Sequence, residues 1–334
     1  MVRVAGGLDR RFDLPLAALG RHSQALPPTS ARQLQKTPYW CLARVLGILD
    51  SATGVVVDSA MGSSKDSEQA LSALLLKRSW DQWIILGDRN FGVYSVARTT
   101  VVAHALLRLT KSRAAKLARS AGLKLAPGLD ELLSWAPSRH DQCPTGVTPL
   151  PVPGRLVVVR VKRPGFRPLT LYLFATLRDQ IQCPAQELAK LYAQRWQIEL
   201  CFRYIKTQRE LGFLECQSAE MARKEWLAGL IAYNLIRWLM AAAAALAQVP
   251  VRFLSFSRAR ELLLGWFIRS AVRGPTLAAW KRLLGRIAKA RLPKRRKPRP
   301  SEPRAIRAFQ NDVAKLVGSR AAARKKLAKH NANS

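Results

Sequence analysis

Residues 41–110 alternate between strand-like apolar runs and short helical segments, and this alternation limits the possible folds most. The run after Asp66 or Ser67, with Glu68 behind it, has the start signal of a capped helix. The expected elements, in order, are strands 41–49 and 54–60 joined as a hairpin, a helix at 66–77, a strand at 83–87, a helix at 92–103 and a strand at 104–110. Elements mixed in this order predict an α/β fold with a mixed sheet.

The rest of the chain changes from this mixed pattern to a helical one. Residues 111–183 contain several prolines and two strand-like runs, at 155–162 and 169–176. After them, apolar residues recur at helical spacing over 185–208, 219–247, 257–268 and 275–290. We therefore expect five regions: the first part of a core at 1–110, a partly β insertion at 111–183, the second part of the core at 184–250, a helical C-terminal region at 251–292, and a basic linker and tail at 293–334.

Four polar side chains return to one face of the predicted helix 185–208. Tyr192, Arg195, Glu199 and Lys206 follow one another at steps of three, four and seven residues, which places them within roughly 60° of arc. Such a face suits a metal-bound phosphodiester, because the acid can hold a cation while the basic groups clamp phosphates. The alternative is an amphipathic surface helix with Arg–Glu and Glu–Lys pairs. The residues between them supply the buried face: Trp196, Ile198, Leu200, Phe202 and Ile205.

The chain carries a strong positive charge. Its 56 Lys and Arg against 21 Asp and Glu give a formal net charge of +35, which predicts a polyanionic partner. Nucleic acid and an anionic membrane surface are the two candidates. Nine Trp and six Tyr among the cations favour nucleic acid, because bases can stack on these rings.

Residues 226–246 form an apolar run about long enough to span a bilayer. Asn234 and Arg237 lie in its middle, where an arginine is costly, so we expect a buried helix and no membrane partner. The five cysteines are scattered without a C-x-x-C pair and the four histidines lie far apart, so no zinc site is expected. This cysteine usage, with no apolar signal segment at the N-terminus, predicts a cytoplasmic protein.

A further acid stands directly after a predicted strand. Asp88 follows the apolar run WIILG, and a carboxylate at a strand end is rigidly held. Two-metal phosphoryl transfer needs carboxylates from separate elements to converge on cations about 4 Å apart, and Asp88 and Glu199 come from separate elements. The alternative role for Asp88 is a turn aspartate that caps the next helix.

Residues 192–206 read YAQRWQIELCFRYIK and fit Y-x2-R-x3-E-x6-K at every fixed position. This pattern resembles the signature of the insertion-sequence DDE transposases of the type-four family. ILGDRNFG at 85–92 resembles the segment that holds the second catalytic aspartate of that family. The similarity covers most of residues 40–310, with further matches at 47–54, 67–75 and 221–240.

The resemblance implies an RNase H-like mixed sheet with a β-rich insertion before the helix of the catalytic glutamate, and a helical C-terminal region. It also implies Mg²⁺ in a two-metal site, with Asp88 and Glu199 as the second and third acids, and cleavage and strand transfer of double-stranded DNA. By the family pattern, Tyr192, Arg195 and Lys206 would contact phosphates near the transposon end. A homodimer in the DNA complex and a nucleoid-associated location are expected.

The chain departs from the family pattern at its start, where the first catalytic acid should lie. The family's first aspartate precedes Gly-Thr and follows a helical region, whereas eight residues precede Asp9 and two arginines follow it. Asp9 is the candidate for the first catalytic and metal-binding acid, whereas Asp50 and Asp58 lie in the hairpin and are interpreted as structural. The expectation is an N-terminally truncated copy. An active or impaired transposase and a non-catalytic DNA-binding remnant both stay open.

Overall fold

The computed structural model describes residues 3–8, 12–16, 41–63, 65–78, 80–100, 103–141, 143–161, 169–208 and 218–293, with isolated positions beyond them. The chain divides into two units. The first comprises Met1–Val159 and Leu171–Leu292, and the second comprises Arg160–Thr170 and Pro293–Ser334. In the second unit, the described strands β10 (Ala305–Ile306) and β11 (Val313–Ala314) form an antiparallel pair.

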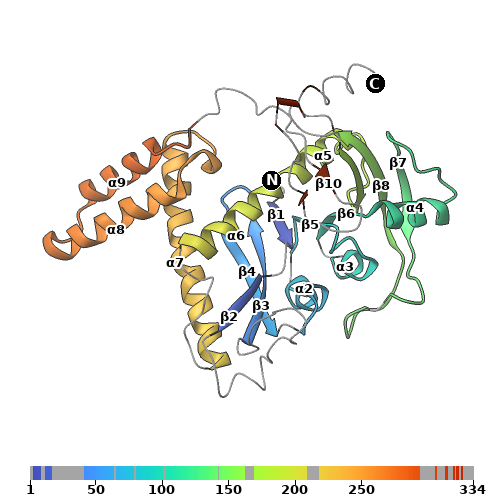
Figure 1. Cartoon of the computed structure of the whole chain (residues 1–334), viewed down its shortest axis with the longest axis horizontal. Helices are drawn as coiled ribbons and strands as arrows, with labels where there is room; N and C mark the ends of the chain where they lie inside the picture. Colours follow the sequence, from blue (N-terminus) through green and yellow to red (C-terminus); the bar gives the residue numbers. More distant parts are fainter. Residues whose placement is uncertain are drawn as a thin grey trace. The chain divides into compact units, whose positions relative to one another are not determined.

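Nine of the described strands form one sheet (Figure 1). They are β1 (Arg3–Leu8), β2 (Phe12–Leu16), β3 (Cys41–Asp50), β4 (Val56–Ser63), β5 (Trp83–Gly87), β6 (His104–Arg108), β7 (Asp130–Trp135), β8 (Val152–Val161) and β9 (Leu169–Ala175). Its central strands lie in the order β4-β3-β1-β5-β6, and among these only β3 runs against the others. This confirms the predicted α/β fold with an RNase H-like mixed sheet.

Helices occur at every position that the sequence periodicity predicted. They are α2 (Glu68–Leu76), α3 (Tyr94–Thr99), α4 (Lys111–Ser120), α5 (Ala185–Ala193), α6 (Trp196–Gln208), α7 (Ala219–Leu246), η1 (Val251–Phe253), α8 (Phe256–Arg273) and α9 (Leu277–Lys289). Of these, α4, in the segment expected to be irregular, and the short η1 were not predicted. α8 runs five residues beyond the predicted end at 268, and the helix predicted over 185–208 is divided into α5 and α6. The start of α2 has the predicted cap, since the Ser67 side chain accepts from the Ala70 N–H at 3.0 Å.

The hairpin β3–β4 is confirmed, and its acids have structural roles. Asp50 accepts hydrogen bonds from the Ala52 N–H at 3.1 Å and the Thr53 hydroxyl at 2.6 Å, which is the geometry of a turn aspartate. Asp58 forms an ion pair with Arg78 at 2.8 Å. Asp50 therefore holds the turn of the hairpin, and Asp58 links β4 to the end of α2.

The central strand β3 is apolar on both sides because helices cover both faces of the sheet. Val45 and Leu49 belong to the core that contains α6, α7, α8 and α9, whereas Leu46 and Ile48 belong to the core that contains α2 and α3. Successive side chains of a strand point to opposite faces, so one strand supplies both cores.

The strands of segment 111–183 continue the same sheet beyond β6. β9 pairs antiparallel with β6, placing Phe174 opposite Leu107, and β8 and β7 follow in order. Trp135 of β7 packs edge-on against Phe174 at 4.9 Å and against Tyr94 of α3 at 6.3 Å. This segment therefore shares a core with α3.

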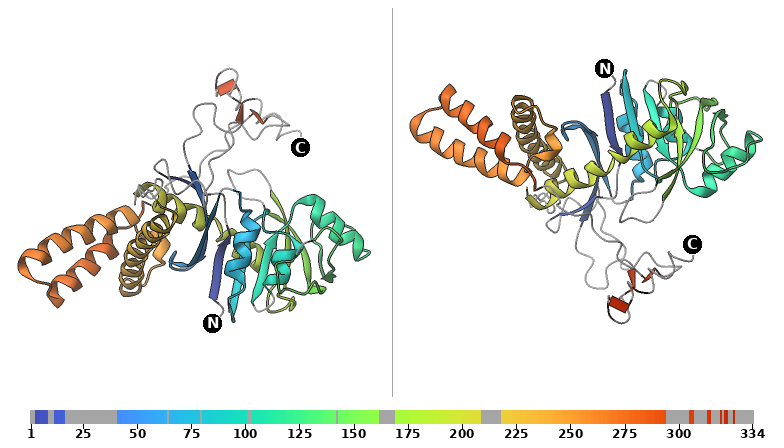
Figure 2. Two further views of the ribbon diagram at one scale, coloured as in Figure 1. Left: turned by 90° about the horizontal axis from the view of Figure 1, so that it is seen from below. Right: turned by 90° about the horizontal axis from the view of Figure 1, so that it is seen from above.

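α7 buries one face, as predicted for residues 226–246, and exposes another. Tyr233 is fully buried, whereas Ile231 and Trp238 are each 63% exposed. α8 and α9 form an antiparallel pair beside α7 (Figure 2). α7 is long and apolar enough to cross a membrane, judged by length and composition alone, as many buried core helices also are. Half of its apolar stretch is buried inside the protein.

Candidate active site

Asp88 lies directly beyond the C-terminal end of β5, a central strand. β5 runs parallel to both of its neighbours, and Gly87 pairs with Leu8 of β1 and with Leu107 of β6. The carboxyl ends of parallel strands meet at one edge of a sheet, so Asp88 and the end of β6 share that edge. Leu8 lies there too, although Asp9, the next residue in the sequence, is outside the described residues.

The loop after Asp88 is held by side chains from two helices. The Asp88 carboxylate accepts from the Asn90 N–H at 2.7 Å, and Gln69 of α2 donates to the Asn90 carbonyl at 3.1 Å. Arg113 of α4 donates to the Arg89 carbonyl at 2.8 Å. The alternative role for Asp88 holds in part: its carboxylate accepts from the N–H two residues on, as a turn aspartate does, but it does not cap α3, which begins six residues later.

Gly92→Ala is predicted to destabilise this loop. A Cβ at residue 92 would lie 2.1 Å from the carbonyl oxygen of Arg108, so the loop and the end of β6 would have to separate. We expect the free energy of unfolding in urea to fall by about 1–3 kcal/mol. Gly285→Ala on α9 is the control, because a Cβ there meets open space and alanine favours a helix. Equal stability of the two variants would contradict the close approach.

The signature segment is divided between α5 and α6. The prediction of one continuous helix over 185–208 is wrong at Gln194 and Arg195. At this junction the N–H groups of residues 194, 195, 197 and 198 bond to carbonyls three residues earlier, instead of four as in an α-helix. The rotation of 100° per residue in an α-helix therefore does not relate residues on the two sides of this junction.

Two signature side chains are buried rather than exposed to solvent. Tyr192 is 5% exposed and Arg195 is 9% exposed, whereas Trp196, expected on the buried face, is 60% exposed. The Arg195 guanidinium lies 3.2 Å from the Glu199 carboxylate and 5.9 Å from the centroid of the Tyr192 ring. The interpretation of a helix with one wet face is therefore wrong for Tyr192 and Arg195. Lys206 belongs to α6, but its side chain lies outside the described residues.

Tyr192 connects this group to the strand edge that carries Asp88. Burial raises the pKa of the Tyr192 phenol, Arg195 and Arg108 lower it, and Asp88 raises it further. Asp88 and Arg108 therefore both contribute to the electrostatic environment of the Tyr192 phenol. The Tyr192 hydroxyl is enclosed, without a hydrogen bond of normal geometry to the described residues. The candidate site therefore gathers Asp88, Arg108, Tyr192, Arg195 and Glu199.

Arg108 is the member of this site that sequence reasoning missed. It is the last residue of β6 and lies at the same sheet edge as Asp88, because β5 and β6 are parallel. The signal was present in the run HALLR, where a cation ends a buried strand. The same placement of an acid after WIILG had identified Asp88.

The two described acids fit a divalent cation. Asp88 Oδ1 accepts from Asn90 and Glu199 Oε1 accepts from Arg195, while the other carboxylate oxygen of each acid is neither enclosed nor bonded to a described residue. Carboxylate oxygens are the ligands that Mg²⁺ prefers. Within the described ranges no three His, Cys, Asp or Glu residues gather as a metal-binding group. The described part of the chain thus supplies two of the three expected acids.

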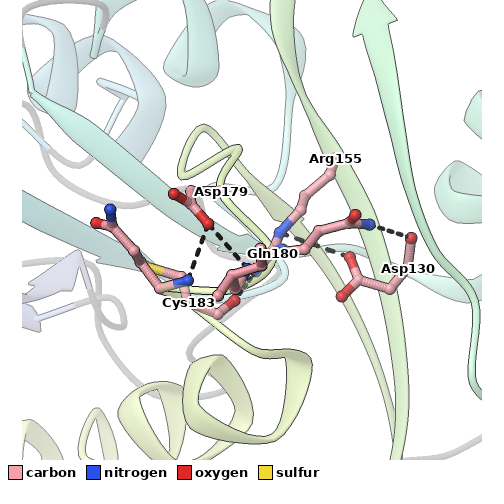
Figure 3. A network of polar contacts seen from close by, with 7 residues as sticks. Asp130, Arg155, Asp179, Gln180 and Cys183 are labelled. Carbon is pink, nitrogen blue, oxygen red and sulfur yellow. Dashed lines mark hydrogen bonds and ion pairs between the residues drawn. The ribbon is translucent and has the colours of Figure 1, made fainter.

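A buried arginine anchors the turn from which α5 starts (Figure 3). Arg155 of β8 is 0% exposed; it donates to the Cys183 carbonyl, and its Nε lies 3.5 Å from the Asp130 carboxylate. Gln180 donates to the Asp130 carbonyl at 2.7 Å, and Asp179 accepts two backbone N–H groups within the turn. Because α5 follows directly, this network fixes the entry into the signature segment.

A strand-borne acid and a helix-borne acid on a mixed sheet are typical of DDE-type enzymes. Residues 31–235 match the family described as "Transposase DDE domain", and the chain belongs to this family.

Relatives agree with this family. The chain is 26% identical over 198 residues to the transposase InsG of insertion sequence element IS4 from Escherichia coli K12, covering 58% of this chain and 42% of that protein. It is 30% identical over 151 residues to the putative transposase y4zB of Sinorhizobium fredii, covering 45% of this chain and 37% of that protein. Each match therefore covers less than half of the relative.

Among solved structures, a piggyBac transposase synaptic complex with hairpin DNA aligns with a TM-score of 0.41. The alignment has 12% identity and covers 76% of this chain and 53% of that one.

Proposed function

We propose that this chain is a DDE transposase that cleaves double-stranded DNA at the element ends and transfers the strands into target DNA, with Mg²⁺ as cofactor. The observation that carries the proposal is that Asp88 stands at the end of a central parallel strand and Glu199 on a separate helix, each with one carboxylate oxygen that is not bonded to a described residue. Acids on a strand end and a separate helix are what a two-metal site requires.

In this proposal three acids, Asp9, Asp88 and Glu199, hold the metal. Two bound Mg²⁺ ions supply activation of the attacking hydroxyl and stabilisation of the leaving oxygen. The pairing of Leu8 with Gly87 supports Asp9, because each of these residues directly precedes a candidate acid. The fixed loop after β5 keeps the Asp88 carboxylate in place.

The basic groups of the site serve the DNA backbone. Arg195 holds the Glu199 carboxylate in position and, with Arg108 and Lys206, provides positive charge for phosphates. Tyr192 is too enclosed for direct contact with DNA in this conformation, so its role is to support Arg195 through the ring. The net charge of +35 favours association with nucleoid DNA in the cytoplasm, and a homodimer would bring two DNA ends together.

The test is metal-dependent cleavage of DNA that carries the coding sequence and its flanks. With Mg²⁺ the purified chain should nick this DNA at discrete positions near the ends, and EDTA should abolish the nicks. If Asp9 is the first acid, Asp9→Asn should lower the cleavage rate as strongly as Asp88→Asn does.

Two outcomes would change the assignment. Cleavage by Asp9→Asn at the wild-type rate would exclude Asp9 as an essential acid. Tight DNA binding by the wild-type chain without any metal-dependent cleavage would overturn the proposed activity and favour the alternative, a non-catalytic DNA-binding remnant.

A further inference from the structure

Arg237 is a buried cation to which the described residues supply no carboxylate. It lies in the middle of α7, is only 6% exposed, and forms no ion pair with a described acid. Buried charges are normally paired, because an isolated ion is costly to remove from water. Arginine stays protonated at neutral pH, so the charge cannot be relieved by loss of a proton.

The groups around Arg237 form a cage that is polar and aromatic. Its Nε donates to the Tyr233 hydroxyl at 2.8 Å, and its Nη2 lies 3.2 Å from Cys201 Sγ. The ring centroids of Tyr204, Tyr233 and Phe256 lie 5.6, 5.3 and 5.1 Å from its Cζ. Burial raises the pKa of Tyr233 well above its ordinary value, so this phenol stays neutral. The rings favour a cation but bring no full negative charge.

Arg237 lines a small pocket, and its third guanidinium nitrogen, Nη1, is free to bond a group bound there. Arg237 lines a pocket of about 50 Å³ together with Gln197 and Arg252. Nη1 makes no hydrogen bond within the described residues and is not an enclosed atom. At about 10–15 Å³ for each enclosed water, the volume suits a small tetrahedral ion.

The charged residues that line the pocket are both basic, among mostly apolar and small neighbours. Arg252 of η1, whose Cζ lies 5.2 Å from the centroid of the Phe253 ring, and Gln197 of α6 are among the lining residues, and no described acid contributes to the lining. Two like charges beside one space repel each other unless an anion lies between them. Guanidinium groups bind phosphate oxygens through charge-assisted hydrogen bonds.

We propose that the pocket formed by Arg237, Arg252 and Gln197 binds a phosphate group, either of a DNA backbone or of free phosphate. This site is separate from the candidate active site and independent of the proposed cleavage. Gln197 and Cys201 are each two residues from Glu199 on α6, which places them on nearly the opposite face of the helix. A bound phosphate would join α6, α7 and η1.

Thermal unfolding of the full chain at constant ionic strength tests the pocket. Replacing chloride by phosphate at about ten times its dissociation constant should raise the midpoint by about 3 °C. Arg252→Gln should lose most of this increase, whereas Arg273→Gln, an exposed arginine at the end of α8, should retain it. The comparison of two exposed arginines removes the general effect of phosphate on a basic protein.

Affinity for a short DNA duplex identifies the source of the phosphate. If Arg252→Gln weakens duplex binding at least fivefold more than Arg273→Gln does, the occupant is a DNA backbone phosphate. If only the phosphate-induced midpoint shift separates the two variants, the occupant is free phosphate. If the variants behave alike in both measurements, the proposal is overturned. Arg252 is exposed, so its replacement should leave the fold intact.

Discussion

Glu199→Gln is expected to lower Mg²⁺-dependent DNA cleavage by about a thousandfold, equivalent to about 4 kcal/mol of transition-state stabilisation. Glutamine keeps the shape of the side chain but removes the charge that would hold a cation and that now pairs with Arg195 at 3.2 Å. DNA affinity should change little, because the basic groups remain. Initial cleavage rates at saturating protein, with binding measured in parallel, give the comparison.

Glu187→Gln is the matched control for this variant. Glu187 is also a helical glutamate paired with a cation, Lys190, at 2.6 Å, but its side chain is 59% exposed and lies outside the site. The Glu187→Gln variant should cleave DNA at the wild-type rate. Loss of the Arg195–Glu199 pair should cost about 1–3 kcal/mol of stability, so folding is checked in urea. Wild-type cleavage by a folded Glu199→Gln protein would remove Glu199 from the catalytic acids.

Arg155→Met is expected to lower the free energy of unfolding by about 3–5 kcal/mol, because it breaks a buried ion pair from one side. The substitution leaves the Asp130 carboxylate without its cation and the Cys183 carbonyl without its donor. Urea denaturation gives the loss. Arg160→Met, at an exposed position of the same strand, is the control and should cost well under 1 kcal/mol. Similar losses in both variants would contradict a structural role for the buried pair.

The loss of unfolding free energy in Arg155→Met should also depend on pH. Burial raises the pKa of Asp130, although Arg155 partly lowers it. Because the pKa of Asp130 is higher in the folded state than in the unfolded state, protonation of Asp130 stabilises the folded protein. This stabilisation is fully present below the unfolded-state pKa and is lost as the pH rises through the folded-state pKa. Without Arg155 the folded pKa rises further. The loss of unfolding free energy should therefore be smaller near about pH 4 than at neutral pH, and a constant loss would contradict this.

Local sequence signals were sufficient to predict the structure of a segment wherever that structure depends only on neighbouring residues. The hairpin residue Asp50 and the cap residue Ser67 act through backbone groups two or three residues away, so their roles follow from spacing alone. The strand WIILG identified Asp88 in the same way, because a buried apolar run of this length must end where the polar residues begin. The α/β fold followed from the order of such segments.

Tertiary packing decided which of the polar residues are buried and which partners they meet. The spacing of Tyr192, Arg195 and Glu199 indicated one solvent-facing stripe, but the chain tightens at Arg195 and buries the first two side chains. Arg155 meets Asp130 of another strand, and Arg108 of β6 influences Tyr192 of α5, across separations in sequence that periodicity cannot relate. The sequence by itself determined the hairpin β3–β4, the strand β5 and most of the helices, and its charge predicts an anionic partner. Only the folded chain decided the contacts, because they depend on strand order and burial, which are properties of the whole sheet.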